Sequence, residues 1–218
     1  MIVFPLDKLE VRILGVLLEK RLTTPGIYPL SLNALVSACN QKSNRNPVMS
    51  LDQETVLAGV EGLLEKGLVM NISGDRVAKY GHFFREKSEI LPKEEAILSV
   101  LLLRGPQTMG EIRTRCERMH SFQEIEEVES TLDSLIKGKH FLFQQEDGPM
   151  AWVIKLPVQP GRKEPRYAHL FMGEPDLSPE ISPTPLSRAG TLSEEVAEMR
   201  RELTELREEF AAFKAQFD

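Results

Sequence analysis

The segment ILGVLL, at residues 13–18, occurs again as ILSVLL at residues 97–102. In both copies the apolar residues recur at the spacing of a helix with a buried face. A second pair follows downstream, because VEGLLEKGLV (60–69) and TLDSLIKGKHFL (131–142) each describe a helix that ends at Lys-Gly and continues into an apolar strand. The chain is therefore expected to contain one structural unit twice.

Each unit is predicted to hold three helices and a β-hairpin. The first copy has expected helices at 6–20, 29–39 and 51–66, followed by strands LVMNI and RVAKY joined across 73–75. Pairs of the capping-box type, Ser50 with Gln53 and Ser121 with Glu124, are expected to begin the third helix of each copy.

The second copy has expected helices at 92–104, 108–119 and 122–137, the middle one opened by Thr108 and Glu111. Its strands are expected at 140–145, 150–156 and 166–171. Three short helices closed by a hairpin are typical of the winged helix, a helix-turn-helix variant.

The expected fold class is α+β and mostly helical, with two tandem winged-helix domains and a C-terminal heptad helix. We expect the first domain at 1–89, the second at 90–172, a Pro-rich linker at 173–191, and an amphipathic or coiled-coil helix at 192–218. Apolar residues in the last segment alternate in steps of four and three, which favours self-association over docking on the chain's own body. The candidate oligomerisation residues are Leu192, Val196, Met199, Leu203, Leu206, Phe210, Phe213 and Phe217.

Charge is distributed unevenly along the chain. Residues 1–89 carry 11 Lys and Arg against 10 Asp and Glu, and residues 90–172 carry 11 against 12. The net charge of −6 therefore lies in residues 173–218. The nearly neutral body neither excludes a polyanionic partner nor requires one.

The sequence predicts no catalytic residues, no cofactor and no metal site. Its two cysteines, Cys39 and Cys116, lie far apart and are expected as buried free thiols in a reducing cytoplasm, and the four histidines show no zinc-binding spacing. No apolar stretch is long enough to cross a membrane. An enzyme is not expected.

The segment CNQKSNRNP, at residues 39–47, lies within about 12 residues that the first copy has in excess of the second. A surface made by this loop and the following hairpin is the candidate nucleic-acid-binding site, because such side chains bind phosphates or base edges. Its residues are Lys42, Asn44, Arg45, Arg76 and Lys79. The alternative is a turn held by its Asn side chains, with solvated Lys and Arg. Further basic residues line 113–118 and 162–166.

Four segments resemble the YceH family of bacterial proteins over residues 6–174 as a whole. They are TTPGIYPLSLNALVSACNQKSNRNPVM (23–49), LLLRGPQTMGEIRTRCERM (101–119), VESTL (128–132) and PGRKEPRYAHLFMGE (160–174). The resemblance implies two winged-helix-like domains in tandem. It supplies no activity and no catalytic residues.

Two functions are left open. The first is a cytoplasmic, transcription-regulator-like protein that binds double-stranded DNA weakly through the loop and wing of the first domain. The second is a protein-interaction module that docks a protein partner and forms a homodimer through the C-terminal helix. The third helices begin with SLDQET and FQEIEEVE, whose carboxylates would repel DNA in the usual winged-helix docking.

Overall fold

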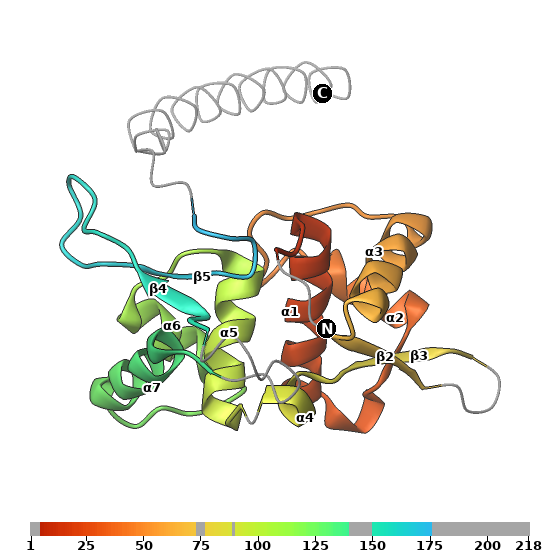
Figure 1. Ribbon diagram of the computed structural model, residues 1–218, viewed down its shortest axis with the longest axis horizontal. Coiled ribbons are helices and arrows are strands. Elements are labelled where there is room, and N and C mark those ends of the chain that lie inside the picture. Colours follow the sequence, from red (N-terminus) through yellow and green to blue (C-terminus); the bar gives the residue numbers. More distant parts are fainter. Residues whose placement is uncertain (1–4, 73–76, 89, 140–149, 176–218) are drawn as a thin grey trace, which may run out of the picture. The chain divides into compact units, whose positions relative to one another are not determined.

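The structure, a computed structural model, describes residues 5–72, 77–88, 90–139 and 150–175 (Figure 1). About half of these residues are helical and two small antiparallel sheets complete the fold, so the expected α+β, mostly helical class is confirmed. Residues 1–176 form one compact unit that contains both copies of the repeat. The expected helix at 192–218 and its oligomerisation residues lie outside the described residues, and dimerisation through them stays a prediction.

The first copy contains the three expected helices and the expected hairpin. A short strand, β1, precedes the second helix and pairs with β3, which gives an antiparallel sheet in the order β1-β3-β2. The elements are α1 (Lys8–Thr23), the 3-10 turn η1 (Pro25–Ile27), β1 (Leu30–Ser31), α2 (Leu32–Cys39), α3 (Gln53–Glu65), β2 (Val69–Ile72) and β3 (Lys79–His82). The short helix α4 (Phe84–Ser88) follows and was not expected from the sequence.

The second copy repeats this order with a smaller sheet. Gln107 forms an isolated bridge with Tyr167, in the place where Leu30 of β1 pairs with Tyr80. The elements are α5 (Pro92–Arg104), α6 (Met109–Cys116), α7 (Ile125–Lys137), β4 (Val153–Lys155) and β5 (Tyr167–His169). The strand expected at 140–145 lies outside the described residues.

One of the three expected capping boxes is confirmed and two are wrong. The pair at 108–111 caps α6 in both directions. Helix α3 begins later than the pair at 50–53 requires, because Asp52 accepts the hydrogen bond of Thr55 N at 2.8 Å. Helix α7 has Glu124 at its N-cap and no side-chain cap bond, so the pair at 121–124 is not used either. An Asp one turn before the buried residues is as good a cap as Ser, and burial of the apolar face decides where the helix starts.

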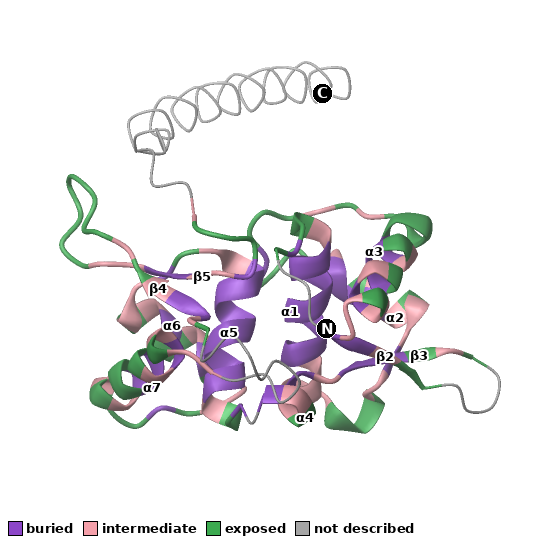
Figure 2. Ribbon diagram, viewed as in Figure 1, coloured by how far each residue is buried: buried purple, intermediate pink, exposed green. Residues whose placement is uncertain are grey.

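The two helices that carry the repeated segments, α1 and α5, run side by side at the centre of the unit (Figure 1) and make its most extensive contact between described elements. Every residue of α1 from Glu10 to Glu19 is buried (Figure 2), since α2, α3 and α5 surround the helix. Gly15 permits the close approach, because a Cβ at this position would lie 3.0 Å from Leu102 Cβ and Leu103 Cγ. Ser99, the residue that corresponds to Gly15 in ILSVLL, is also small and fully buried.

The ends of the two sheets meet on the same core. The segments KYGHFF (79–84) and RYAHLF (166–171) are a third pair of similar sequences, and their final residues contact each other. The Phe84 ring lies 5.6 Å from the Phe171 ring and 4.8 Å from the Trp152 ring. Corresponding residues that contact one another are expected where two copies are related by an approximate two-fold axis.

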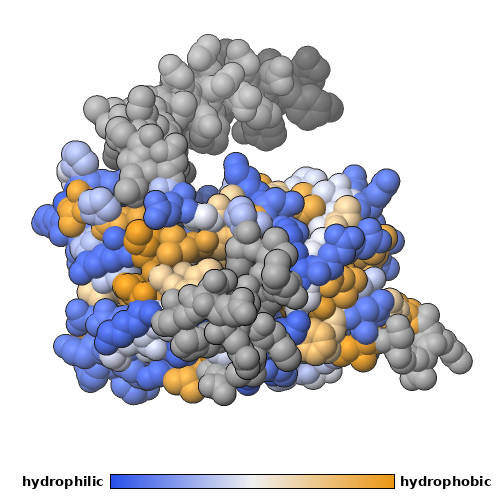
Figure 3. Space-filling view, in the orientation of Figure 1, coloured by the Kyte–Doolittle hydropathy of each residue, from blue (hydrophilic) through white to orange (hydrophobic). Residues whose placement is uncertain are grey.

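Hydrophilic residues cover much of the visible face, and an apolar area lies near β4 and β5 (Figure 3).

A buried polar pair joins the copies beside this aromatic cluster. His82 of β3 is fully buried, and its Nε2 lies 3.1 Å from Glu95 Oε1 of α5. Its Nδ1 accepts a hydrogen bond from Phe84 N, so the ring hydrogen is on Nε2 and faces the carboxylate. Burial lowers the pKa of His82. Burial would raise the pKa of Glu95, but the nearby His82 and the hydrogen bond from Arg85 outweigh it and hold that pKa low.

Enlarging Gly15 should destabilise the protein. Gly15→Leu is expected to lower the free energy of unfolding by about 3 kcal/mol, because the larger side chain forces α1 and α5 apart. Gly110→Ala in α6 is the matched control, since nothing lies within 4 Å of its added Cβ. It should raise the free energy of unfolding by about 0.5–1 kcal/mol through helix propensity. Urea unfolding measures both, and a neutral Gly15→Leu would contradict the close packing.

Stability should fall in mild acid partly because of His169. Burial lowers its folded-state pKa from 6.5 to about 4. The unfolded state therefore binds more protons between these values, and stability decreases as the pH falls from 6.5 toward 4. Between pH 7 and pH 4 the free energy of unfolding of the native chain should fall by about 3 kcal/mol more than that of His169→Gln. Urea unfolding at a series of pH values measures the difference, and parallel curves would show that His169 does not contribute.

Candidate functional site

The loop at 40–52, which contains most of CNQKSNRNP, is fixed to the unit by its polar side chains. Asn40 closes the loop, since its side-chain amide donates to Leu51 O at 2.7 Å and its Oδ1 accepts from Leu51 N at 2.8 Å. Arg12 of α1 donates to the carbonyl oxygens of Cys39 and Pro47. Asn46 N donates to Leu103 O of α5 at 2.9 Å, which attaches the loop to the second copy.

Arg45 is part of this framework. It is 5% exposed, and its guanidinium donates to both carboxylate oxygens of Glu19, at 2.7 and 3.2 Å. It also donates to Ala38 O and Gln41 Oε1. Five hydrogen bonds, counting one to Asn44 O, use the donors with which an arginine would bind phosphate. The structure thus gives Arg45 a role in folding the loop, and it does not present the side chain to a nucleic acid.

The other predicted nucleic-acid-binding residues that the structure describes lie at the two ends of α2, and their role as one surface stays a prediction. Lys42 and Asn44 are exposed in the loop, whereas Arg76 lies outside the described residues. Lys79 is exposed on β3 and pairs with Ser31, the N-cap of α2, while Lys42 comes after the C-terminal end of that helix. The eight residues of α2 separate the two ends by about 12 Å.

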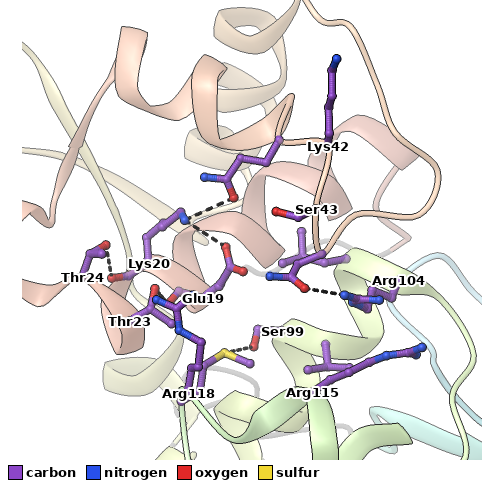
Figure 4. A pocket seen from close by; sticks show the side chains of 15 residues that line it. Glu19, Lys20, Thr23, Thr24, Lys42, Ser43, Ser99, Arg104, Arg115 and Arg118 are labelled. Carbon is purple, nitrogen blue, oxygen red and sulfur yellow. Dashed lines mark hydrogen bonds and ion pairs between the residues drawn. The ribbon is translucent and has the colours of Figure 1, made fainter.

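Lys42 and Asn44 instead lie at a cavity of about 510 Å³ between the two copies (Figure 4). The cavity is lined by the C-terminal part of α1, the loop, α5, and the end of α6 with the residues that follow it. Its lining residues are Glu19, Lys20, Thr23, Thr24, Gln41, Lys42, Ser43, Asn44, Ser99, Val100, Leu103, Arg104, Arg115, Arg118 and Met119. Cavities of roughly 300–1,000 Å³ are the usual size of small-molecule sites.

The lining of this cavity is strongly basic. Five of its residues are Lys or Arg, and Glu19 is the one carboxylate among the lining residues, already paired with Arg45 and with Lys20 at 3.5 Å. The five basic residues, named here the basic cluster, are Lys20, Lys42, Arg104, Arg115 and Arg118. Burial, followed by the positive charges of Arg115 and Arg45, lowers the pKa of the Arg104 guanidinium. The site therefore has an excess of positive charge.

Two members of the basic cluster have no protein partner in the described part of the chain. Lys20 bonds Gln41, Arg104 donates to Asn44 Oδ1, and Arg115 pairs with Glu111 at 3.3 Å. Lys42 and Arg118 are exposed and make no hydrogen bond or ion pair with any described residue. The Lys42 side chain points away from the other lining residues at the edge of the cavity (Figure 4).

Helix dipoles account for only part of this charge. Three helices, α1, α5 and α6, end at the cavity, and basic residues in a last turn are favourable beside the free carbonyl groups. Three C-terminal ends supply about −1.5 elementary charges. The lining has an excess of four positive charges, and Arg45 and Glu111, which pair with lining residues, cancel each other. A net positive site is left after the helix ends are counted.

The cysteines are buried free thiols, as expected. Burial raises the pKa of both Cys39 and Cys116 to about 12, which makes them poor nucleophiles.

Within the ranges that the structure describes, no group of three or more His, Cys, Asp or Glu side chains could hold a metal ion. None of the described helices combines the length and apolar character needed to cross a bilayer.

The sequence patterns indicated only part of the cavity. Arg115 and Arg118 were recognised as a basic run, and Lys42 and Asn44 as loop residues, but Lys20 and Arg104 were not singled out. Each of these two stands in the last turn of a long buried helix. The available signal was the repeat itself, because Lys20 and Arg104 occupy corresponding positions after ILGVLL and ILSVLL.

Comparison with known proteins places the chain among similar sequences over most of its length. Residues 6–162 match the family described as "Protein of unknown function, DUF480". A UPF0502 protein of Citrifermentans bemidjiense is 51% identical over 200 residues, which cover 91% of this chain and 88% of that protein. Proteins of the same name from Solibacter usitatus and Vibrio parahaemolyticus are 44% and 43% identical, with 98% of this chain covered and 98% and 96% of theirs. These matches confirm the family resemblance drawn from the sequence.

Removing the Arg45 side-chain charge should destabilise the protein. Arg45→Met is expected to lower the free energy of unfolding by about 3 kcal/mol, because Glu19 loses its closest partner in a buried setting. Lys42→Met removes the same charge three residues earlier, where the side chain has no described partner, and should change stability by less than about 0.5 kcal/mol. Fluorescence of Trp152, the only tryptophan, follows urea unfolding of both variants. Equal stabilities would contradict a structural role for Arg45.

Proposed function

This chain belongs to the DUF480/UPF0502 family, and we propose that it is a non-enzymatic, cytoplasmic protein that binds double-stranded DNA through its basic cluster. The observation that carries the proposal is the gathering of Lys20, Lys42, Arg104, Arg115 and Arg118 at one place, with two of them free of described partners. Non-specific affinity for DNA arises chiefly from Lys and Arg that replace the counterions of phosphates.

The proposed interface differs from the usual docking of a winged helix, in which the third helix enters the major groove. The exposed side of α3 carries Asp52, Glu54 and Glu61. That of α7 carries Glu124, Glu126, Glu129 and Asp133. Carboxylates at these positions repel phosphates, so the loop at 40–52 and α6 are the better contact surface.

The element order supports winged-helix units as the framework of this interface. The first copy has the order helix, strand, helix, helix, strand, strand, and its first strand pairs with the last. The second copy follows the same order, with the Gln107–Tyr167 bridge in place of a first strand. In the first copy the segment before the third helix is the long loop, which carries the exposed Lys42.

A second candidate is a protein-interaction role. It is favoured by the exposed carboxylates of α7, which form a surface suited to a basic protein partner. Copurification of a protein partner without DNA binding would support this role over the first.

Binding of duplex DNA should decrease steeply with salt. A duplex of mixed sequence, titrated at several salt concentrations and followed by fluorescence anisotropy, should give a linear decrease of log K with log salt. Lys42→Ala and Arg118→Ala should each weaken binding for all sequences and reduce the slope by about 1, because each removes one phosphate contact.

The matched control is Lys137→Ala, which removes one exposed positive charge from the last turn of α7. It should leave affinity and slope unchanged if the basic cluster is the interface. Equal effects of all three variants would point to general electrostatic attraction, and salt-independent binding or no binding at low salt would refute the proposal.

A further inference from the structure

The basic cluster is more than a charged surface, because the cavity that it surrounds has the features of a small-molecule binding site. It draws residues from both copies, and Figure 4 shows Lys20 and Arg118 on one side with Arg104 and Arg115 on the other. Ser99 lies between these two sides (Figure 4). A charged surface for a polymer needs no hollow, whereas this one has an open cavity of about 510 Å³.

The lining combines charge with apolar surface. Val100, Leu103 and Met119 contribute an apolar part, and the hydroxyl groups of Thr23, Thr24, Ser43 and Ser99 add short polar contacts. Small-molecule sites commonly have such a mixture, in which apolar residues supply area and a few polar groups fix the orientation. The hydroxyl groups of Thr23, Thr24 and Ser99 already donate to nearby carbonyl oxygen atoms, Glu19 O, Lys20 O and Ala96 O.

We propose that this cavity binds a small organic phosphate, with the phosphate at Arg118 and Lys20 and the organic part against Val100, Leu103 and Met119. Three arginines and two lysines around one volume match a dianion better than a single carboxylate. The planar guanidinium groups also suit the several oxygen atoms of a phosphate, which accept hydrogen bonds from more than one direction.

Binding would connect the two copies of the repeat. Lys20 belongs to α1 of the first copy and Arg118 follows α6 of the second, so a phosphate held by both adds a bridge between the copies. A ligand that binds only the folded state raises its stability in proportion to the logarithm of ligand concentration. If the protein also binds DNA as proposed above, the small phosphate occupies the same basic cluster and competes with DNA. This competition rests on the proposed function, whereas binding of the small phosphate does not.

Calorimetric titration of the full chain with adenosine monophosphate, in the absence of DNA, tests the site. Saturable binding with one molecule per chain is expected, and adenosine without its phosphate should bind much more weakly. Arg118→Ala should weaken binding at least about tenfold, because this arginine has no other described partner. Lys137→Ala, the control with the same change of net charge, should bind normally.

Ser43→Trp separates a cavity from a charged surface, since it places a bulky side chain at a lining residue without altering any charge. It should abolish binding of adenosine monophosphate while the chain keeps its unfolding midpoint. Inorganic pyrophosphate serves as a second probe for the phosphate part alone. The proposal is overturned if neither probe binds at about 10 mM in low salt, or if Arg118→Ala and Ser43→Trp bind as the native chain does. If the native chain binds adenosine monophosphate but does not bind DNA, only the proposed function is refuted.

Discussion

The pairing of α1 with α5 is the contact on which the rest of the structure depends. These helices carry the two copies of the repeated segment, and Gly15 and Ser99 keep their separation small. Their contact brings the aromatic ends of the two sheets together at Phe84 and Phe171, and it attaches the loop at 40–52 to α5 through Asn46. Corresponding elements therefore pack on one another as two subunits of a symmetric dimer do, but within one chain.

Much of this fold could be predicted from the sequence, because the buried face of a helix appears there as apolar residues at helical spacing. The three helices of each copy were placed to within a few residues, and the mostly helical class followed from them. The sequence-based predictions were wrong where a short local feature decides the structure and a neighbouring residue can take the same role. At α3 an Asp two residues beyond the expected Ser caps the helix, and two-residue strands such as β1 are too short to show alternation.

The roles of single polar residues could not be predicted in the same way. Arg45 stands in a segment rich in Asn and Lys and has the composition of a solvated loop residue. Its burial depends on Glu19, 26 residues earlier in α1, and on three carbonyl or amide oxygens that the loop brings together only when folded. The same reasoning explains why His82 gave no signal, because its partner Glu95 belongs to the other copy.

The basic cavity could not be predicted from the sequence for a further reason. Basic and acidic residues are intermixed along the chain, and only folding separates them in space. Residues 1–172 carry 22 basic and 22 acidic side chains, so their composition indicates no preference for an anion. In the structure α3 and α7 each carry several exposed carboxylates, whereas five basic residues surround one cavity. Beyond about 8 Å, physiological salt screens most of the interaction between exposed charges. An anion at the cavity therefore responds to the basic cluster far more than to the net charge of −6, and local arrangement decides what this chain binds.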